Sequence, residues 1–131
     1  MTRSGKRKRR LTIDDRTYLW SLRHTHHALA DGPCEDCCET LSIRSLEGRS
    51  GLRIHFPHGP DRLVPDGYPQ PSGTVGTRDG RTLNLHGPGT VRALLDEAIR
   101  HGLNPGEPTT EELDGWTRFD AVHKTISLMR R

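Results

Sequence analysis

The stretch Leu41–Phe56, LSIRSLEGRSGLRIHF, alternates apolar and polar residues on both sides of a turn that contains Gly48 and Gly51. Apolar residues at every second position indicate strands with one buried face, because successive side chains of a strand point to opposite sides. The two halves therefore predict a β-hairpin with an apolar inward face, whose polar positions include Arg53 and His55.

Further turns extend this pattern along the chain. The pairs Asp14–Asp15 and Asp79–Gly80 each separate two alternating segments, and Asp-Gly suits the positive φ angles of a type I′ hairpin. Residues 109–113 could begin a helix, with Thr109 and Glu112 as a capping box, but the Asp114–Gly115 turn that follows favours a strand here and a further strand over 116–122. The sequence thus predicts a twisted antiparallel sheet built from successive hairpins.

One helix is predicted immediately after the third of these hairpins. Between Val91 and Ile99, apolar residues recur with the spacing of one helix face. Thr90 suits the N-cap, Gly102 suits the C-terminal cap, and Pro105 prevents the helix from continuing. One apolar helix face requires one apolar sheet face, so the expected fold class is α+β, with the antiparallel sheet packed against one main helix.

Length and charge divide the chain into a tail and one domain. With 131 residues and 31% hydrophobic content, a single domain with a modest core is expected. Of the 20 Lys and Arg, six lie in residues 1–10, which contain no acid, whereas the other 14 are outnumbered by 17 acidic residues. We therefore expect a basic flexible tail over 1–10 and a single α+β domain over 11–131, with weak non-specific nucleic-acid contact through the tail.

A cluster of metal-ligand side chains lies in the segment 24–38. The candidate ligands are His24, His26, Cys34, Cys37 and Cys38. Imidazoles and thiolates are the donors that tetrahedral zinc prefers, so zinc is the one cofactor that the sequence suggests. The alternative is a polar surface hairpin with reduced thiols. A thioredoxin-like redox motif is disfavoured, because the acidic neighbours of these cysteines raise the pKa of a thiol.

The residues at the entrance of the predicted helix could bind an anion. Free backbone amides at a helix N-terminus attract negative charge, and a histidine could add a further donor. The candidate anion-binding residues are His86, Gly87, Gly89 and Thr90. The same Gly-Pro-Gly run is equally well explained as a turn between a strand and a helix.

The segment Pro57–Gly73 contains five prolines and three glycines in 17 residues. A connection of this length and composition is either functional or an irregular cover over the core. The functional interpretation predicts a recognition loop with Tyr68 and Arg62 as partner-binding residues. The alternative interpretation buries Leu63 and Val64 against the sheet.

Four runs of the chain resemble a group of small uncharacterised actinobacterial proteins. These runs are Tyr18–His26, Cys37–Leu41, Ser72–Gly76 and Leu83–Ala98. The resemblance covers residues 10–122 and implies a stand-alone bacterial cytoplasmic domain. It implies no activity, cofactor or catalytic residue.

The sequence as a whole favours a cytoplasmic, non-enzymatic module that binds another protein or regulates it. An odd number of cysteines and the absence of an apolar run of bilayer length disfavour a secreted disulfide scaffold or a membrane protein. No catalytic residues are assigned. Two alternatives stay open: a nucleic-acid-associated protein that uses the basic tail, and a small histidine-dependent enzyme in which His55, His58 and His86 converge.

Overall fold

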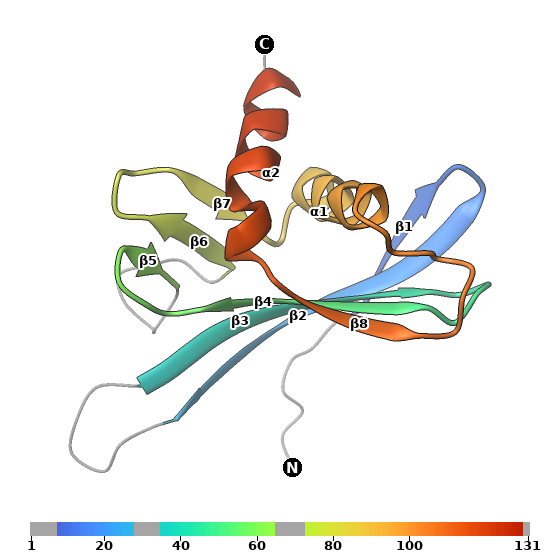
Figure 1. The fold of residues 1–131 in the computed structure, drawn as a ribbon, viewed down its shortest axis with the longest axis horizontal. Coiled ribbons are helices and arrows are strands. Elements are labelled where there is room, and N and C mark those ends of the chain that lie inside the picture. Colours follow the sequence, from blue (N-terminus) through green and yellow to red (C-terminus); the bar gives the residue numbers. More distant parts are fainter. Residues whose placement is uncertain (1–7, 28–34, 65–72, 130–131) are drawn as a thin grey trace.

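The computed structural model describes residues 8–27, 35–64 and 73–129, with backbone only for 25–27 and 35–37 (Figure 1). The described residues form two sheets and two helices, so the α+β class is confirmed. The elements are β1 Arg9–Ile13, β2 Arg16–His27, β3 Glu35–Ser45, β4 Gly51–Pro57, β5 Arg62–Leu63, β6 Thr74–Thr77, β7 Thr82–Asn84, α1 Pro88–Arg100, β8 Thr110–Asp114 and α2 Trp116–Met129. Neither helix of this part of the chain is long and apolar enough to cross a bilayer.

The main sheet has the strand order β1-β2-β3-β4-β8. The first four strands are antiparallel to their neighbours, whereas β8 runs parallel to β4. Trp20, Ile43 and Leu52 are cross-strand neighbours in this sheet and are at most 3% exposed. Both helices lie on the side of the sheet that carries these apolar residues (Figure 1). The core therefore lies between the sheet and the helices, as the alternation predicts.

Three of the four predicted hairpin turns are present, at Asp14–Asp15, Gly48–Gly51 and Asp79–Gly80. Asp14 and Asp15 both have positive φ angles, of 48° and 67°, at the turn between β1 and β2. Gly80 has a φ of 96° at the turn between β6 and β7, which pair in the smaller sheet, ordered β5-β6-β7. Val64, which precedes this sheet's central strand, is buried, whereas Leu63 is 41% exposed. The cover interpretation of the proline-rich segment therefore holds for one of its two apolar residues.

Helix α1 presents the predicted face to the core but begins earlier than expected. Val91, Leu94 and Leu95 are all at most 1% exposed. The N-cap is Gly87 rather than Thr90, and Pro88 occupies the first helical position. Proline suits this position because its fixed φ is helical and its missing N–H would have no partner within the helix. Thr90 is instead buried in the first turn.

The segment after Gly115 forms helix α2, so the predicted strand over 116–122 is wrong. Trp116 donates its backbone N–H to the Asp114 side chain, which caps the helix and does not form a hairpin turn. A Cβ atom at position 115 would lie 2.3 Å from the Phe56 ring, so glycine lets the chain pass closely over that ring. The three-residue spacing of Trp116, Phe119 and Val122, all buried, then matches a helix face.

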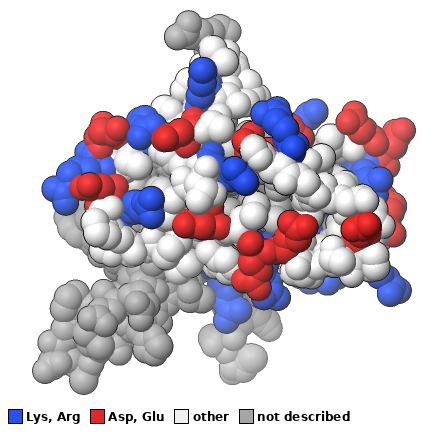
Figure 2. Space-filling view, viewed as in Figure 1, with Lys and Arg blue, Asp and Glu red and all other residues white. Residues whose placement is uncertain are grey.

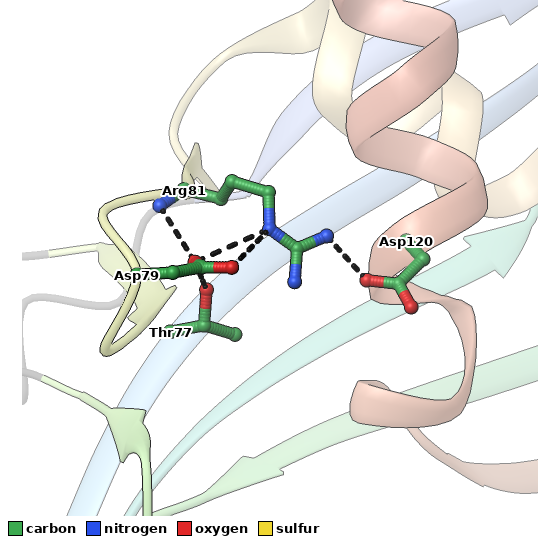
Figure 3. A network of polar contacts seen from close by, with 4 residues as sticks. All are labelled: Thr77, Asp79, Arg81 and Asp120. Carbon is green, nitrogen blue, oxygen red and sulfur yellow. Dashed lines mark hydrogen bonds and ion pairs between the residues drawn. The ribbon is translucent and has the colours of Figure 1, made fainter.

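A polar network joins the β6–β7 turn to α2 (Figure 3). Arg81 donates to both Asp79 and Asp120, with 2.6 Å between Arg81 Nη1 and Asp120 Oδ1. Hydrogen bonds from the Thr77 hydroxyl and from Arg81 lower the pKa of Asp79 to about 2. The Arg81 guanidinium also lies 5.5 Å from the centre of the Phe119 ring. The network therefore positions α2 against the smaller sheet.

Candidate functional site

The main sheet has a polar face on the side away from the helices. Because side chains alternate along each strand, the residues between the buried positions of β1 to β4 and β8 all point to this side. In the described part of the chain, no helix covers them (Figure 1). We call this surface the outer face; it comprises Lys8, Arg10, Leu19, Ser21, Arg23, Cys38, Thr40, Ser42, Arg44, Gly51, Arg53, His55, Thr110, Glu112 and Asp114.

The outer face is basic. Its exposed cationic side chains are Lys8, Arg10, Arg23, Arg44 and Arg53, against two acids, Glu112 and Asp114. Figure 2 shows Lys and Arg side chains projecting at the lower margin of the described surface, below the sheet. Among the described residues, only Arg53 of these five cations approaches an acid, with Nη1 3.9 Å from Glu112 Oε2. The other four charges are therefore open to solvent and to an anionic ligand.

The strand register determines how these charges are spaced. Arg10 pairs with Leu19, and Leu19 pairs with Arg44, so the two arginines lie two strands or about 10 Å apart. Arg53 lies on the next strand, diagonal to Arg44, at about 7 to 8 Å. A shallow hollow of about 260 Å³, lined in part by Lys8, Arg44 and Arg53, lies within this array. The cations are thus spread over several strands at intervals that suit a chain of anionic groups.

One hydrogen-bonded chain crosses the outer face from β3 to β8. His55 Nδ1 lies 3.0 Å from Thr40 Oγ1, and His55 Nε2 lies 2.9 Å from Glu112 Oε1. The His55 side chain is 33% exposed and that of Glu112 59% exposed. A threonine hydroxyl can donate or accept, so the contact to Nδ1 is compatible with neutral and with protonated imidazole. His55 therefore has partners on both ring nitrogens while it stays accessible.

A second polar cluster lies on the helix side of the sheet. The carboxylate of Glu39, which is 1% exposed, has Oε2 3.0 Å from His24 Nδ1. Burial raises the pKa of Glu39, and hydrogen bonds from His24 and from the Gly73 backbone act in the opposite direction. Gly73 has a φ of 81°, and a Cβ atom there would lie 2.4 Å from the His86 ring. His24, Glu39, Gly73 and His86 therefore pack together where β3 meets the smaller sheet.

The predicted zinc ligands are only partly described. Cys38 follows the strand alternation onto the outer face, whereas its neighbour Glu39 and the paired His24 point to the helix side. Cys38 and His24 therefore cannot bind one ion together, which removes Cys38 from a zinc site that contains His24. Burial raises the pKa of the Cys38 thiol, which also disfavours a thiolate there.

The other zinc ligands lie outside what the structure describes. Cys34 is not among the described residues, and neither are the side chains of His26 and Cys37. Among the described residues, no group of three or more His, Cys, Asp or Glu side chains could hold a metal ion. Zinc binding by His24, His26, Cys34 and Cys37 stays a prediction.

The residues of the predicted anion site lie together at the start of α1, but some of their backbone N–H groups already donate hydrogen bonds within the protein. The backbone N–H of His86 donates to Asn84 Oδ1, and that of Gly87 donates to the Asn84 carbonyl oxygen, each at a distance of 3.0 Å. Gly89 lies at the start of the helix with open space beside it, while Thr90 is buried. An anion at this helix end would therefore find fewer free amides than the sequence suggests.

The predicted partner-binding residues are only partly described, and two of the three histidines of the enzyme alternative lie apart. The Arg62 guanidinium lies over the Trp116 ring at 5.5 Å, whereas Tyr68 lies outside the described residues. His55 is on the outer face, but His86 packs against Gly73 on the helix side, so these two histidines do not converge. His58 is exposed between β4 and β5.

Sequence reasoning missed the outer face as a basic surface. The signal was present, because Arg23, Arg44 and Arg53 occupy polar positions of three alternating strands. Only the register shows that they share one surface, on which Arg44 and Arg53 are diagonal neighbours. No protein-family model matches the chain, and no similar protein was found among curated proteins or solved structures.

Proposed function

We propose that the protein binds nucleic acid through the sugar-phosphate backbone, with the outer face as the contact surface. The observation that carries this proposal is the array of exposed, largely unpaired cations on one sheet face. A polyanion that meets such an array releases its condensed counterions, which favours binding. The three basic residues that precede Lys8 in the sequence raise the net positive charge of the chain, which also favours association with a polyanion.

The composition of the outer face argues for binding without sequence preference. Of the described residues that form this face, none is Phe, Tyr or Trp, so the bases have no large aromatic ring on which to stack. Ser21, Ser42 and Thr40 supply hydroxyl groups, which commonly hydrogen-bond to phosphate oxygens. The proposed contacts are therefore with the backbone, and affinity is expected to fall steeply with added salt.

The test removes three central charges of the outer face. A variant with Arg23→Gln, Arg44→Gln and Arg53→Gln is compared with the wild type by fluorescence anisotropy, using labelled single-stranded and duplex oligonucleotides at several salt concentrations. The slope of log K against log salt should fall by about two to three, because each phosphate contact contributes about 0.7 to 0.9. Melting temperature should change little, because all three side chains are exposed.

A matched control removes the same charge elsewhere. Arg78, Arg92 and Arg100 are exposed and lie on the smaller sheet and α1, away from the outer face. Their replacement by glutamine should leave the salt slope almost unchanged. Equal losses in both variants would mean that net charge alone attracts nucleic acid, and no measurable binding by the wild type would contradict the proposal outright.

A second candidate function is binding of another protein near Arg62. A hollow of about 800 Å³ is lined by Arg62, Arg78 and Arg81, and Arg62 stacks on Trp116. Arginine and tryptophan are enriched at the energetic centres of protein interfaces. Under this candidate, Arg62→Ala should weaken a partner captured by crosslinking, whereas Arg44→Ala should not. A larger loss of partner binding with Arg44→Ala than with Arg62→Ala would favour the outer face as the binding surface.

A further inference from the structure

We infer that the outer face also cleaves RNA, with Glu112 and His55 as a proton-transferring pair and Arg53 as the cation that stabilises the reacting phosphate. This inference rests on the proposed function, because the substrate is the backbone that the outer face would bind. Arg53 and Glu112 are exposed and His55 is partly exposed, and the three side chains lie within one cluster of contacts on the adjacent strands β4 and β8. Metal-free phosphodiester cleavage needs a base, an acid and a group that stabilises negative charge, and a carboxylate, an imidazole and a guanidinium can fill these roles.

The geometry gives each group a separate role. Glu112 Oε1 is 2.9 Å from His55 Nε2, and Glu112 Oε2 is 3.9 Å from Arg53 Nη1. Glu112 is on the edge strand β8 and 59% exposed, so solvent space beside its carboxylate allows it to turn from His55 when a phosphate enters between them. His55 is less exposed and is held by Thr40 through Nδ1. The imidazole therefore keeps its orientation while the carboxylate moves.

The reaction is a transesterification within the RNA. The Glu112 carboxylate accepts the proton of the 2′-hydroxyl as its oxygen forms a bond to phosphorus. The protonated His55 donates from Nε2 to O5′ as the P–O5′ bond breaks, and Arg53 offsets the added negative charge on the phosphate oxygens. The products are a 2′,3′-cyclic phosphate and a 5′-hydroxyl, and no water or metal ion enters this step.

The direct contact between Glu112 and His55 also allows both groups to return to their starting protonation states after each turnover. When the products leave, Glu112 carries the extra proton and His55 is neutral, so a transfer across their contact returns both to the starting state. The Thr40 hydroxyl can donate to Nδ1 of the neutral ring and accept from Nδ1 of the protonated ring, so it supports both states. DNA lacks the 2′-hydroxyl and should be bound without being cleaved.

The test separates cleavage from binding. Wild-type protein is incubated in chelator with labelled oligo(U) RNA, its 2′-O-methyl analogue and oligo(dT), and the products are identified by mass spectrometry. We expect cyclic-phosphate ends from the RNA alone. His55→Gln and Glu112→Gln should each slow cleavage by about a hundredfold or more, while both variants still bind the 2′-O-methyl analogue.

Matched controls use the same substitutions away from the outer face. His101 pairs with Glu97 on α1, and Glu107 lies in the connection before β8, so His101→Gln and Glu107→Gln should cleave like the wild type.

The outcomes distinguish the two proposals. RNA that is bound but stays intact would overturn the cleavage inference and leave backbone binding in place. Cleavage that persists in both His55→Gln and Glu112→Gln would also overturn it, since other groups would then act. Absence of both binding and cleavage in the wild type would contradict both proposals.

Discussion

At the scale of single residues, Glu39 is the clearest case of a side chain whose environment the sequence did not indicate. A carboxylate that is 1% exposed is costly unless it is hydrogen-bonded, and here His24 and the Gly73 amide supply the partners. Burial still dominates and raises the pKa of Glu39 above its ordinary value of 4.5. The native state therefore binds this proton more tightly than the unfolded state does.

This shift predicts a specific pH dependence of stability. As pH rises above about 4.5, the unfolded state loses the Glu39 proton first, so the ionisation of Glu39 makes the native state relatively less stable. Glu39→Gln keeps the size and hydrogen-bonding capacity but cannot ionise. As pH rises through this window, the free energy of unfolding of Glu39→Gln should therefore increase relative to that of the wild type. Urea denaturation at several pH values measures this difference. Parallel curves, matching the exposed control Glu107→Gln, would contradict the raised pKa.

A second residue-scale prediction concerns the glycine that precedes α2. Gly115→Ala would place a Cβ atom 2.3 Å from the Phe56 ring, and we expect a loss of about 1 to 3 kcal/mol because a buried ring must move. Gly89→Ala is the matched control, because nothing lies within 4 Å of its Cβ position and alanine favours a helix. Thermal unfolding should show Gly115→Ala melting well below Gly89→Ala. Equal melting temperatures would mean that the Phe56 ring can move aside without a cost in stability.

At the scale of elements, α1 carries much of the packing against the main sheet. Leu94 and Leu95 are each 1% exposed, so Leu94→Ala or Leu95→Ala should cost about 2 to 4 kcal/mol of unfolding free energy. Ile99 is on the same helix but 37% exposed, and Ile99→Ala should cost clearly less. Chemical denaturation of the three variants checks the order. Similar losses at all three positions would mean that the helix does not bury the face described.

Also at this scale, β8 and α2 show how one short sequence can support two structures. Asp114–Gly115 is typical of a hairpin turn and favours a strand after it, whereas the three-residue spacing of the apolar residues that follow favours a helix. In the described part of the chain β8 pairs only with β4, and the segment after it forms a capped helix that buries Trp116, Phe119 and Val122. Burial of large side chains outweighs the local turn preference.

At the scale of the whole molecule, the basic tail and the fold are less separate than the charge distribution suggests. Strand β1 begins at Arg9, whose guanidinium lies 4.7 Å from the centre of the Trp20 ring and donates to the His86 carbonyl oxygen. The last two residues of the predicted tail therefore belong to the sheet. Lys8 and Arg10 contribute to the outer face itself.

Two truncations should consequently behave differently. Removal of residues 1–7 should leave the melting temperature nearly unchanged and reduce, without abolishing, binding to nucleic acid, because the cations of the outer face are retained. Removal of residues 1–10 should lower the melting temperature, because Arg9 and part of β1 are lost. Calorimetry and anisotropy on both proteins check this. Complete loss of binding after removal of residues 1–7 would place the nucleic-acid site in the tail.

The sequence by itself determined the local features: the alternating strands, the turns at Asp14–Asp15 and Asp79–Gly80, the buried face of α1 and hence the α+β class. These follow from side-chain periodicity and turn chemistry, which act over a few residues. Only the tertiary structure decided that α2 is a helix and that Thr40, His55 and Glu112 meet. Those outcomes depend on strand register and on burial between segments far apart in the chain, which a local pattern does not encode.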